Sequence, residues 1–68
     1  MIVVHNSHPF RRGDRVRVIR TRHGWHSGDL SGTVVSAWQT ITNVWHYTVR
    51  DVEGYDHEIL HTRDLRPF

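Results

Sequence analysis

The sequence contains no cysteine, no lysine and no long run of apolar residues. Without cysteine, neither a disulfide nor a thiolate metal site can stabilise the fold. The apolar start, Met1 to Val4, is followed by neither a long apolar core nor a small-residue cleavage site, so we expect no secretory signal. No segment approaches the length of a membrane span. These absences predict a soluble, cytoplasmic protein without membrane contact.

The length of the chain, 68 residues, sets the second constraint. A single domain of this size is near the lower limit for burying a sufficient hydrophobic core without disulfides or a bound metal. We therefore expect one small core, or association with another chain, with a homo-oligomer as one form of that association.

Charge is distributed unevenly along the chain. All nine basic residues are arginines, and six of them lie between Arg11 and Arg22 with Asp14 as the single acid. From Gln39 onward five acids outnumber three arginines. The net charge is only +2. A basic first half attracts phosphates or acidic proteins, and an acidic second half repels the same ligands.

Alternation of apolar and polar residues with a period of two recurs along the chain and predicts β-strands. The first, residues 14–20, turns Val16 and Val18 one way and Arg15, Arg17 and Ile19 the other. Further strands are predicted over residues 32–38, 44–52, 55–61 and 66–68. The segment 39–43 either extends the second strand or forms a turn that includes Asn43. The core is predicted to comprise Val16, Val18, Val34, Tyr47, Val49, Ile59 and Leu65, with Trp45 on the same face as Tyr47.

Turn signals separate these strands. A loop rich in Gly, Ser and Asp, residues 21–32, follows the first strand, and Glu53-Gly54 suits a tight hairpin. "TRDL" from Thr62 predicts one 3₁₀ turn, and Pro67 is tolerated in a short closing edge strand. Five short strands at this spacing predict an all-β, small closed barrel, because closure removes exposed strand edges.

The order of four short motifs supports this architecture. "GDRVRV" from Gly13, "GTV" from Gly32, "YTVRD" from Tyr47 and "TRDL" from Thr62 resemble the pattern of SH3-like barrels. That group includes KOW and Tudor-type modules and a small barrel protein of photosystem I, and the chain also resembles short actinobacterial proteins of unknown function. The resemblance implies a five-stranded SH3-like barrel over residues 10–68. Residues 1–9 are then a lead-in or an added edge strand. This fold carries many unrelated functions.

Two local motifs suggest chemistry only weakly. Arg12-Gly13-Asp14 matches an adhesion tripeptide, but we expect it to form the turn that starts the first strand. Seven histidines are present, and His57 and His61 share one side of a predicted strand about 13 Å apart, too far for one ion. His23 and His26 with a distant third ligand are a remaining metal alternative. We predict no metal and no cofactor.

No catalytic signature is present, and we predict no catalytic residue and no enzyme activity. One remote enzyme alternative comes from plasmid-encoded type II dihydrofolate reductases, whose opening the segment from Gly13 to Arg17 resembles. Their pore motif Val-Gln-Ile-Tyr would fall on residues 57–60, where only Ile59 agrees. Glu58 and Leu60 stand where that site requires an amide and a phenol.

A non-catalytic binding module or accessory subunit is the predicted function. We expect a protein partner at the first long loop and the adjacent strand face, because aromatic residues and arginine commonly anchor such contacts. A KOW-like nucleic-acid-binding barrel, with an arginine strip and an exposed tryptophan, is the alternative. The predicted partner-binding residues are Trp25, His23, His26, Arg15, Arg17, Arg22, Trp38 and Tyr55.

Overall fold

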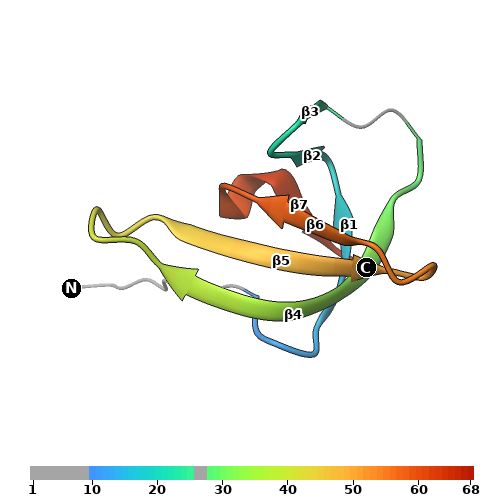
Figure 1. Ribbon diagram of the computed structural model, residues 1–68, viewed down its shortest axis with the longest axis horizontal. Helices are drawn as coiled ribbons and strands as arrows, with labels where there is room; N and C mark the ends of the chain where they lie inside the picture. Colours follow the sequence, from blue (N-terminus) through green and yellow to red (C-terminus); the bar gives the residue numbers. More distant parts are fainter. Residues whose placement is uncertain (1–9, 26–27) are drawn as a thin grey trace.

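The computed structural model describes residues 10–25 and 28–68, so the predictions for residues 1–9 and for His26 lie outside the described residues. Its strands are β1 (Arg15–Val18), β2 (Arg20–Thr21), β3 (Gly24–Trp25), β4 (Ser31–Gln39), β5 (Trp45–Asp51), β6 (Asp56–Ile59) and β7 (Leu65–Pro67). One 3₁₀ turn, η1 (Thr62–Asp64), precedes β7, as the sequence predicts. The described part of the chain is therefore almost entirely β-structure (Figure 1).

Five of the strands form one antiparallel sheet in the order β6-β5-β4-β1-β7. They correspond to the five predicted strands. The predicted number of strands is nevertheless wrong, because β2, which begins at the last residue of the predicted first strand, pairs with β3 in a separate two-stranded ribbon that extends into the expected loop. These strands have two residues each, which is too short to show an alternating pattern.

The sheet is open, and the predicted closure is therefore not observed. Its edge strands, β6 and β7, have four and three residues, and Pro67 in β7 has no N–H to donate. Two further backbone hydrogen bonds extend the contacts of these edge strands, one from the residue after β2 to β6 and one beside the β1–β7 pairing. The Arg22 N–H donates to the Glu58 carbonyl (2.8 Å), and the Ile19 N–H donates to the Asp64 carbonyl (2.8 Å).

The core lies against the inner face of this sheet, and all seven predicted core residues are buried. The alternation in β1 determines which of its side chains enter the core. Val16 and Val18 are buried, while Arg15 and Arg17 beside them are exposed. Phe10 is an eighth core residue that the sequence pattern missed. Its ring lies edge-on to the Tyr47 ring, with centroids 6.1 Å apart. Trp45 is partly buried and packs against the same core.

Tyr47 connects this core to η1. Its side chain is fully buried, and its hydroxyl is hydrogen-bonded to the Thr62 hydroxyl at 2.8 Å. Burial raises the pKa of Tyr47. Because Thr62 opens η1, this bond fixes the turn that carries Arg63 and Asp64.

Two glycines occupy positions that a larger residue would strain. Gly13 has a φ of +98° in the turn before β1, where the Asp14 N–H donates to the Arg11 carbonyl (3.0 Å). Asp14 also accepts a hydrogen bond from the Arg11 N–H, so Arg12-Gly13-Asp14 forms the turn that starts the first strand, as predicted. At Gly32, β4 and β5 approach so closely that a Cβ would collide with the Arg50 carbonyl.

Candidate functional site

A buried carboxylate lies beneath the β2–β3 ribbon. Asp64, at the end of η1, is 4% exposed, and its Oδ2 lies 3.5 Å from Nε of Arg20. Arg20 begins β2, directly after Ile19, whose N–H is bound to the Asp64 carbonyl. A buried charge requires a partner, and this pair holds the Arg20 side chain against η1.

Trp25 is the most exposed tryptophan among the described residues, with 74% of its surface accessible. The ribbon pairs Arg20 with Trp25 directly across its two strands. The Arg20 guanidinium carbon consequently lies 5.0 Å from the centroid of the Trp25 ring, in cation–π geometry. Asp64 therefore orients Trp25 through Arg20, while the ring itself remains open to solvent.

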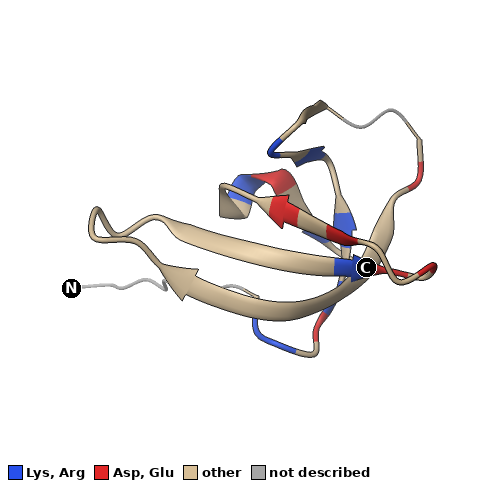
Figure 2. Ribbon diagram, in the orientation of Figure 1, with Lys and Arg blue, Asp and Glu red and all other residues tan. Residues whose placement is uncertain are grey.

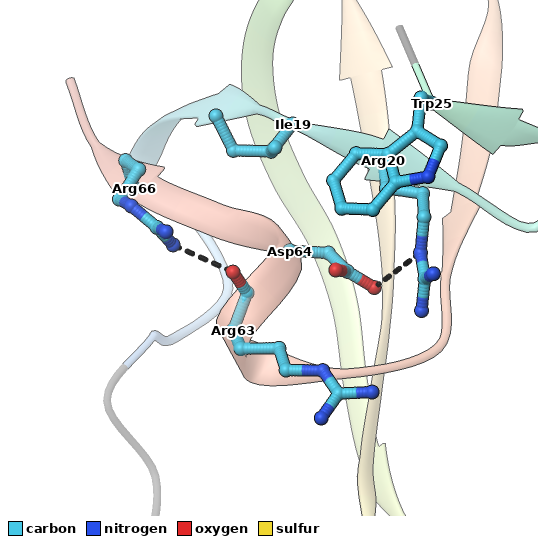
Figure 3. A pocket seen from close by; sticks show the side chains of 6 residues that line it. All are labelled: Ile19, Arg20, Trp25, Arg63, Asp64 and Arg66. Atoms are coloured by element: carbon cyan, nitrogen blue, oxygen red, sulfur yellow. Dashed lines mark hydrogen bonds and ion pairs between the residues drawn. The ribbon is translucent and has the colours of Figure 1, made fainter.

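A cleft of about 320 Å³ opens beside this pair (Figure 3). We call it the arginine cleft, because three arginines contribute to its lining. Arg66 is held there by its own backbone surroundings, since its Nη1 donates to the carbonyls of Arg63 (2.6 Å) and Leu65 (2.8 Å). The cleft is lined by Ile19, Arg20, Trp25, Arg63, Asp64 and Arg66.

The basic surface continues from the cleft along the outer face of β1. Arg17 of β1 is paired with Arg66 of β7 in the antiparallel register, so these two cations lie directly opposite each other. Arg15, two residues earlier, lies over the Phe68 ring at 4.6 Å from its centroid. Acidic residues instead gather on β6 and in the turn before it (Figure 2). The uneven distribution of charge in the sequence is therefore kept in part, although the ion pairs Arg20–Asp64, Arg22–Glu58 and Arg50–Asp56 join the two signs.

The predicted binding residues fall into two groups. Trp25, Arg15 and Arg17 lie on the cleft or on the adjoining basic face, and His23 is exposed in the turn of the β2–β3 ribbon. Arg22, in the same turn, is ion-paired with Glu58 of β6 at 2.8 Å.

Trp38 and Tyr55 do not join the cleft. Trp38 lies near the tip of the β4–β5 hairpin, 45% exposed, with its ring 5.5 Å from that of His46. Tyr55 is in the turn after β5, at the opposite end of that strand, where its carbonyl accepts the Asp51 N–H. Since Trp38 is paired with His46 at the start of β5, the two aromatic residues are separated by most of the strand.

Sequence reasoning missed Arg63, Asp64 and Arg66 as site residues. They are distant from the first loop in sequence and reach it only because β7 pairs with β1 and η1 lies beneath the ribbon. The available signal was "TRDL", which correctly predicted the 3₁₀ turn. Placing Arg63 within this motif and Arg66 after it beside Trp25 would have required the β1–β7 register as well.

No known protein family, no curated protein and no solved structure matches the chain.

A second polar cluster stabilises the turn between β5 and β6. The Asp51 carboxylate accepts hydrogen bonds from the N–H groups of Glu53 (2.9 Å) and Tyr55 (3.0 Å), and its Oδ2 lies 2.8 Å from Nε2 of His57. The hydrogen bond with His57 is the main cause that lowers the pKa of Asp51. The Asp51 carboxylate thus has hydrogen-bond partners within its own turn. We therefore assign this cluster a role in stabilising the turn and not in binding a ligand.

Two further observations concern metals and membranes. Across residues 10–25 and 28–68, no group of three or more histidines and acids is arranged to hold a metal ion. In the same residues, no helix has the length and apolar character needed to cross a membrane.

Proposed function

We propose that this chain is a non-catalytic binding module with an SH3-like fold, which holds a segment of a partner protein in the arginine cleft. The strand order β6-β5-β4-β1-β7 supports the fold assignment, as do the long connection between β1 and β4 and the 3₁₀ turn before the last strand. Binding clefts in small β-domains commonly lie where a long loop approaches neighbouring elements.

One observation carries the proposal, and it is the exposure of an ordered tryptophan. Trp25 leaves 74% of its surface in solvent, yet Arg20 and Asp64 hold its position. Tryptophan and arginine dominate the energetics of protein interfaces, and a side chain that is already ordered loses little entropy when it binds. Since Trp25 contributes little to the core, its exposure is better explained by a partner than by folding.

The test is selection of a displayed random-peptide library on the immobilised protein, with and without the change Trp25→Ala. We expect a peptide consensus that the wild-type protein enriches and the variant does not, while the melting temperature of the variant stays near the wild-type value. Trp38→Ala removes another exposed tryptophan away from the cleft and serves as the matched control. Enrichment that survives Trp25→Ala but not Trp38→Ala would refute the assignment of this cleft.

A nucleic acid is the second candidate ligand, and a specific observation favours it. Arg17 lies opposite Arg66, which lines the cleft together with the exposed Trp25, an arrangement suited to a phosphate backbone next to an unpaired base. Fluorescence-anisotropy titrations against labelled RNA, single-stranded DNA and duplex DNA at low and physiological salt test it. Tight binding that survives physiological salt and is lost in a variant with Arg17→Gln and Arg66→Gln would replace the protein partner with a nucleic acid.

We do not extend the proposal to dihydrofolate reductase chemistry. At the two positions where that resemblance requires an amide and a phenol, Glu58 is ion-paired with Arg22 and Leu60 is an aliphatic side chain.

A further inference from the structure

We infer, on the basis of the proposed function, that the partner segment is acidic. This segment places separate side-chain carboxylates against Arg63 and Arg66, with an apolar residue between them on Trp25 and Ile19.

The charge balance of the arginine cleft is the first argument. Its lining carries three arginines and one aspartate, which leaves a local excess of positive charge. The aspartate, Asp64, is buried and already paired with Arg20. Within the described residues, neither Arg63 nor Arg66 has an acidic partner. The two guanidinium groups point to different sides of the Arg63 carbonyl (Figure 3), so an acidic segment would offer each its own carboxylate without displacing an existing ion pair.

The pairing of β1 with β7 gives a second, independent argument. Arg17 and Arg66 occupy directly opposite positions, and like charges in such a pair destabilise a sheet. Two other exposed arginines avoid this cost, since Arg22 and Arg50 are ion-paired with Glu58 and Asp56. An anion bound beside Arg66 would offset the repulsion, so this position is better suited to the complex than to the free protein.

Arg66 is also oriented before any ligand arrives. Its Nη1 is hydrogen-bonded to the carbonyls of Arg63 and Leu65, which restricts the rotation of a long side chain. The guanidinium has five N–H donors in a planar fork, so these two bonds leave other donors for a carboxylate. An arginine fixed in this way loses less conformational entropy on binding than a free one.

The surroundings of the cleft favour a short acidic segment over a long polyanion. Beyond Arg20, a second hollow of about 260 Å³ is lined in part by Arg22, whose partner Glu58 is half exposed. Asp56 lies on the same strand as Glu58. Glu58 and Asp56 already pair with Arg22 and Arg50. A nucleic-acid strand leaving the cleft on this side would therefore meet no free arginine among the described residues, whereas a short peptide need not extend beyond the cleft.

The experiment compares short fluorescein-labelled peptides by anisotropy at physiological salt. The acidic probe has two Glu-Asp pairs flanking a pair of leucines, and a matched probe has Gln-Asn in place of Glu-Asp. A third probe carries phosphoserine in place of the acidic pairs, and a labelled single-stranded RNA is the fourth. The protein is used as the wild type and as the variants Arg63→Gln and Arg12→Gln. Arg12 is an exposed arginine in the turn before β1, so its variant has the same net charge without altering the cleft.

We expect the wild type to bind the acidic probe at least about tenfold more tightly than the amide probe, because each hydrogen bond to a charged group contributes substantially to binding. Arg63→Gln should weaken binding of the acidic probe about fivefold to tenfold, and Arg12→Gln should change it less than about twofold.

Three results would overturn the inference. These are equal binding of the acidic and amide probes, binding of the phosphoserine or RNA probe without the acidic one, and equal effects of the two arginine variants. Failure of the proposed function has a different signature. If library selection yields a Trp25-dependent consensus without acids, the cleft binds proteins and only the acidic inference fails. If no selected peptide depends on Trp25, the cleft itself is not the binding site.

Discussion

Replacing Gly32 by alanine gives the sharpest test of how β4 and β5 pack. A Cβ at this position would meet the Arg50 carbonyl oxygen and carbon, and it would lie 3.0 Å from Cα of Asp51. These are main-chain atoms of the adjacent strand, so the collision can be removed only if the two strands move apart. Overpacking of this kind costs up to about 3 kcal/mol. Removing a glycine from a strand recovers about 0.5–1 kcal/mol, so we expect Gly32→Ala to lower the free energy of unfolding by about 2 kcal/mol.

That loss is large for so small a domain. A stability of about 0.05–0.15 kcal/mol per residue gives the whole chain roughly 3–10 kcal/mol. A loss of about 2 kcal/mol should lower the melting temperature by about 8–16 °C. The assay is urea and thermal denaturation followed by circular dichroism. Ser36→Ala, an exposed position of the same strand, is the control, with an expected change within about 0.5 kcal/mol. Equal stability of Gly32→Ala and the wild type would refute the close approach of β4 and β5.

Three further predictions concern stability, each measured by the same denaturation experiments. Val49→Ala should cost about 1–3 kcal/mol, because Val49 is fully buried, and a smaller effect would remove it from the core. Tyr47→Phe should cost about 1 kcal/mol through loss of the hydrogen bond to Thr62, and an unchanged stability would show that this bond does not hold η1. Because His57 lowers the pKa of Asp51, the stabilisation from this carboxylate is present above its ordinary pKa of about 4 and is lost as the pH falls through the lower, folded value. Asp51→Asn should therefore flatten the decline of stability at acid pH, and an identical decline in the variant would contradict the assignment.

The sequence predicted the core because the core residues follow a local rule. Val16, Val18, Tyr47 and Val49 alternate with polar residues along their strands, and a period of two places alternate side chains on opposite faces. Phe10 escaped prediction because it precedes β1 and belongs to no alternating run. The predicted closure of the barrel was wrong. Closure depends on the length and register of the edge strands, which their composition does not reveal.

The candidate site was predictable only in part, for a related reason. Trp25 could be identified as exposed because a loop rich in glycine and serine surrounds it. Arg63, Asp64 and Arg66 could not be placed beside it, since their position follows from a pairing between the two ends of the fold. Nothing local in the sequence distinguishes an arginine that faces a cleft from one that faces bulk solvent.

The shortness of the β2–β3 ribbon has a consequence for the motion of the protein. The ribbon has two residue pairs, and the Arg22 bond to Glu58 is one of the few backbone bonds that attach it to the sheet. Segments with so few protected amides open locally without global unfolding, so the amide hydrogens of Thr21 and Trp25 should exchange with solvent far faster than those of Tyr47 and Val49. We therefore expect a slowly exchanging core beside a β2–β3 ribbon that opens locally. A bound ligand should reveal itself as slower hydrogen exchange confined to that element.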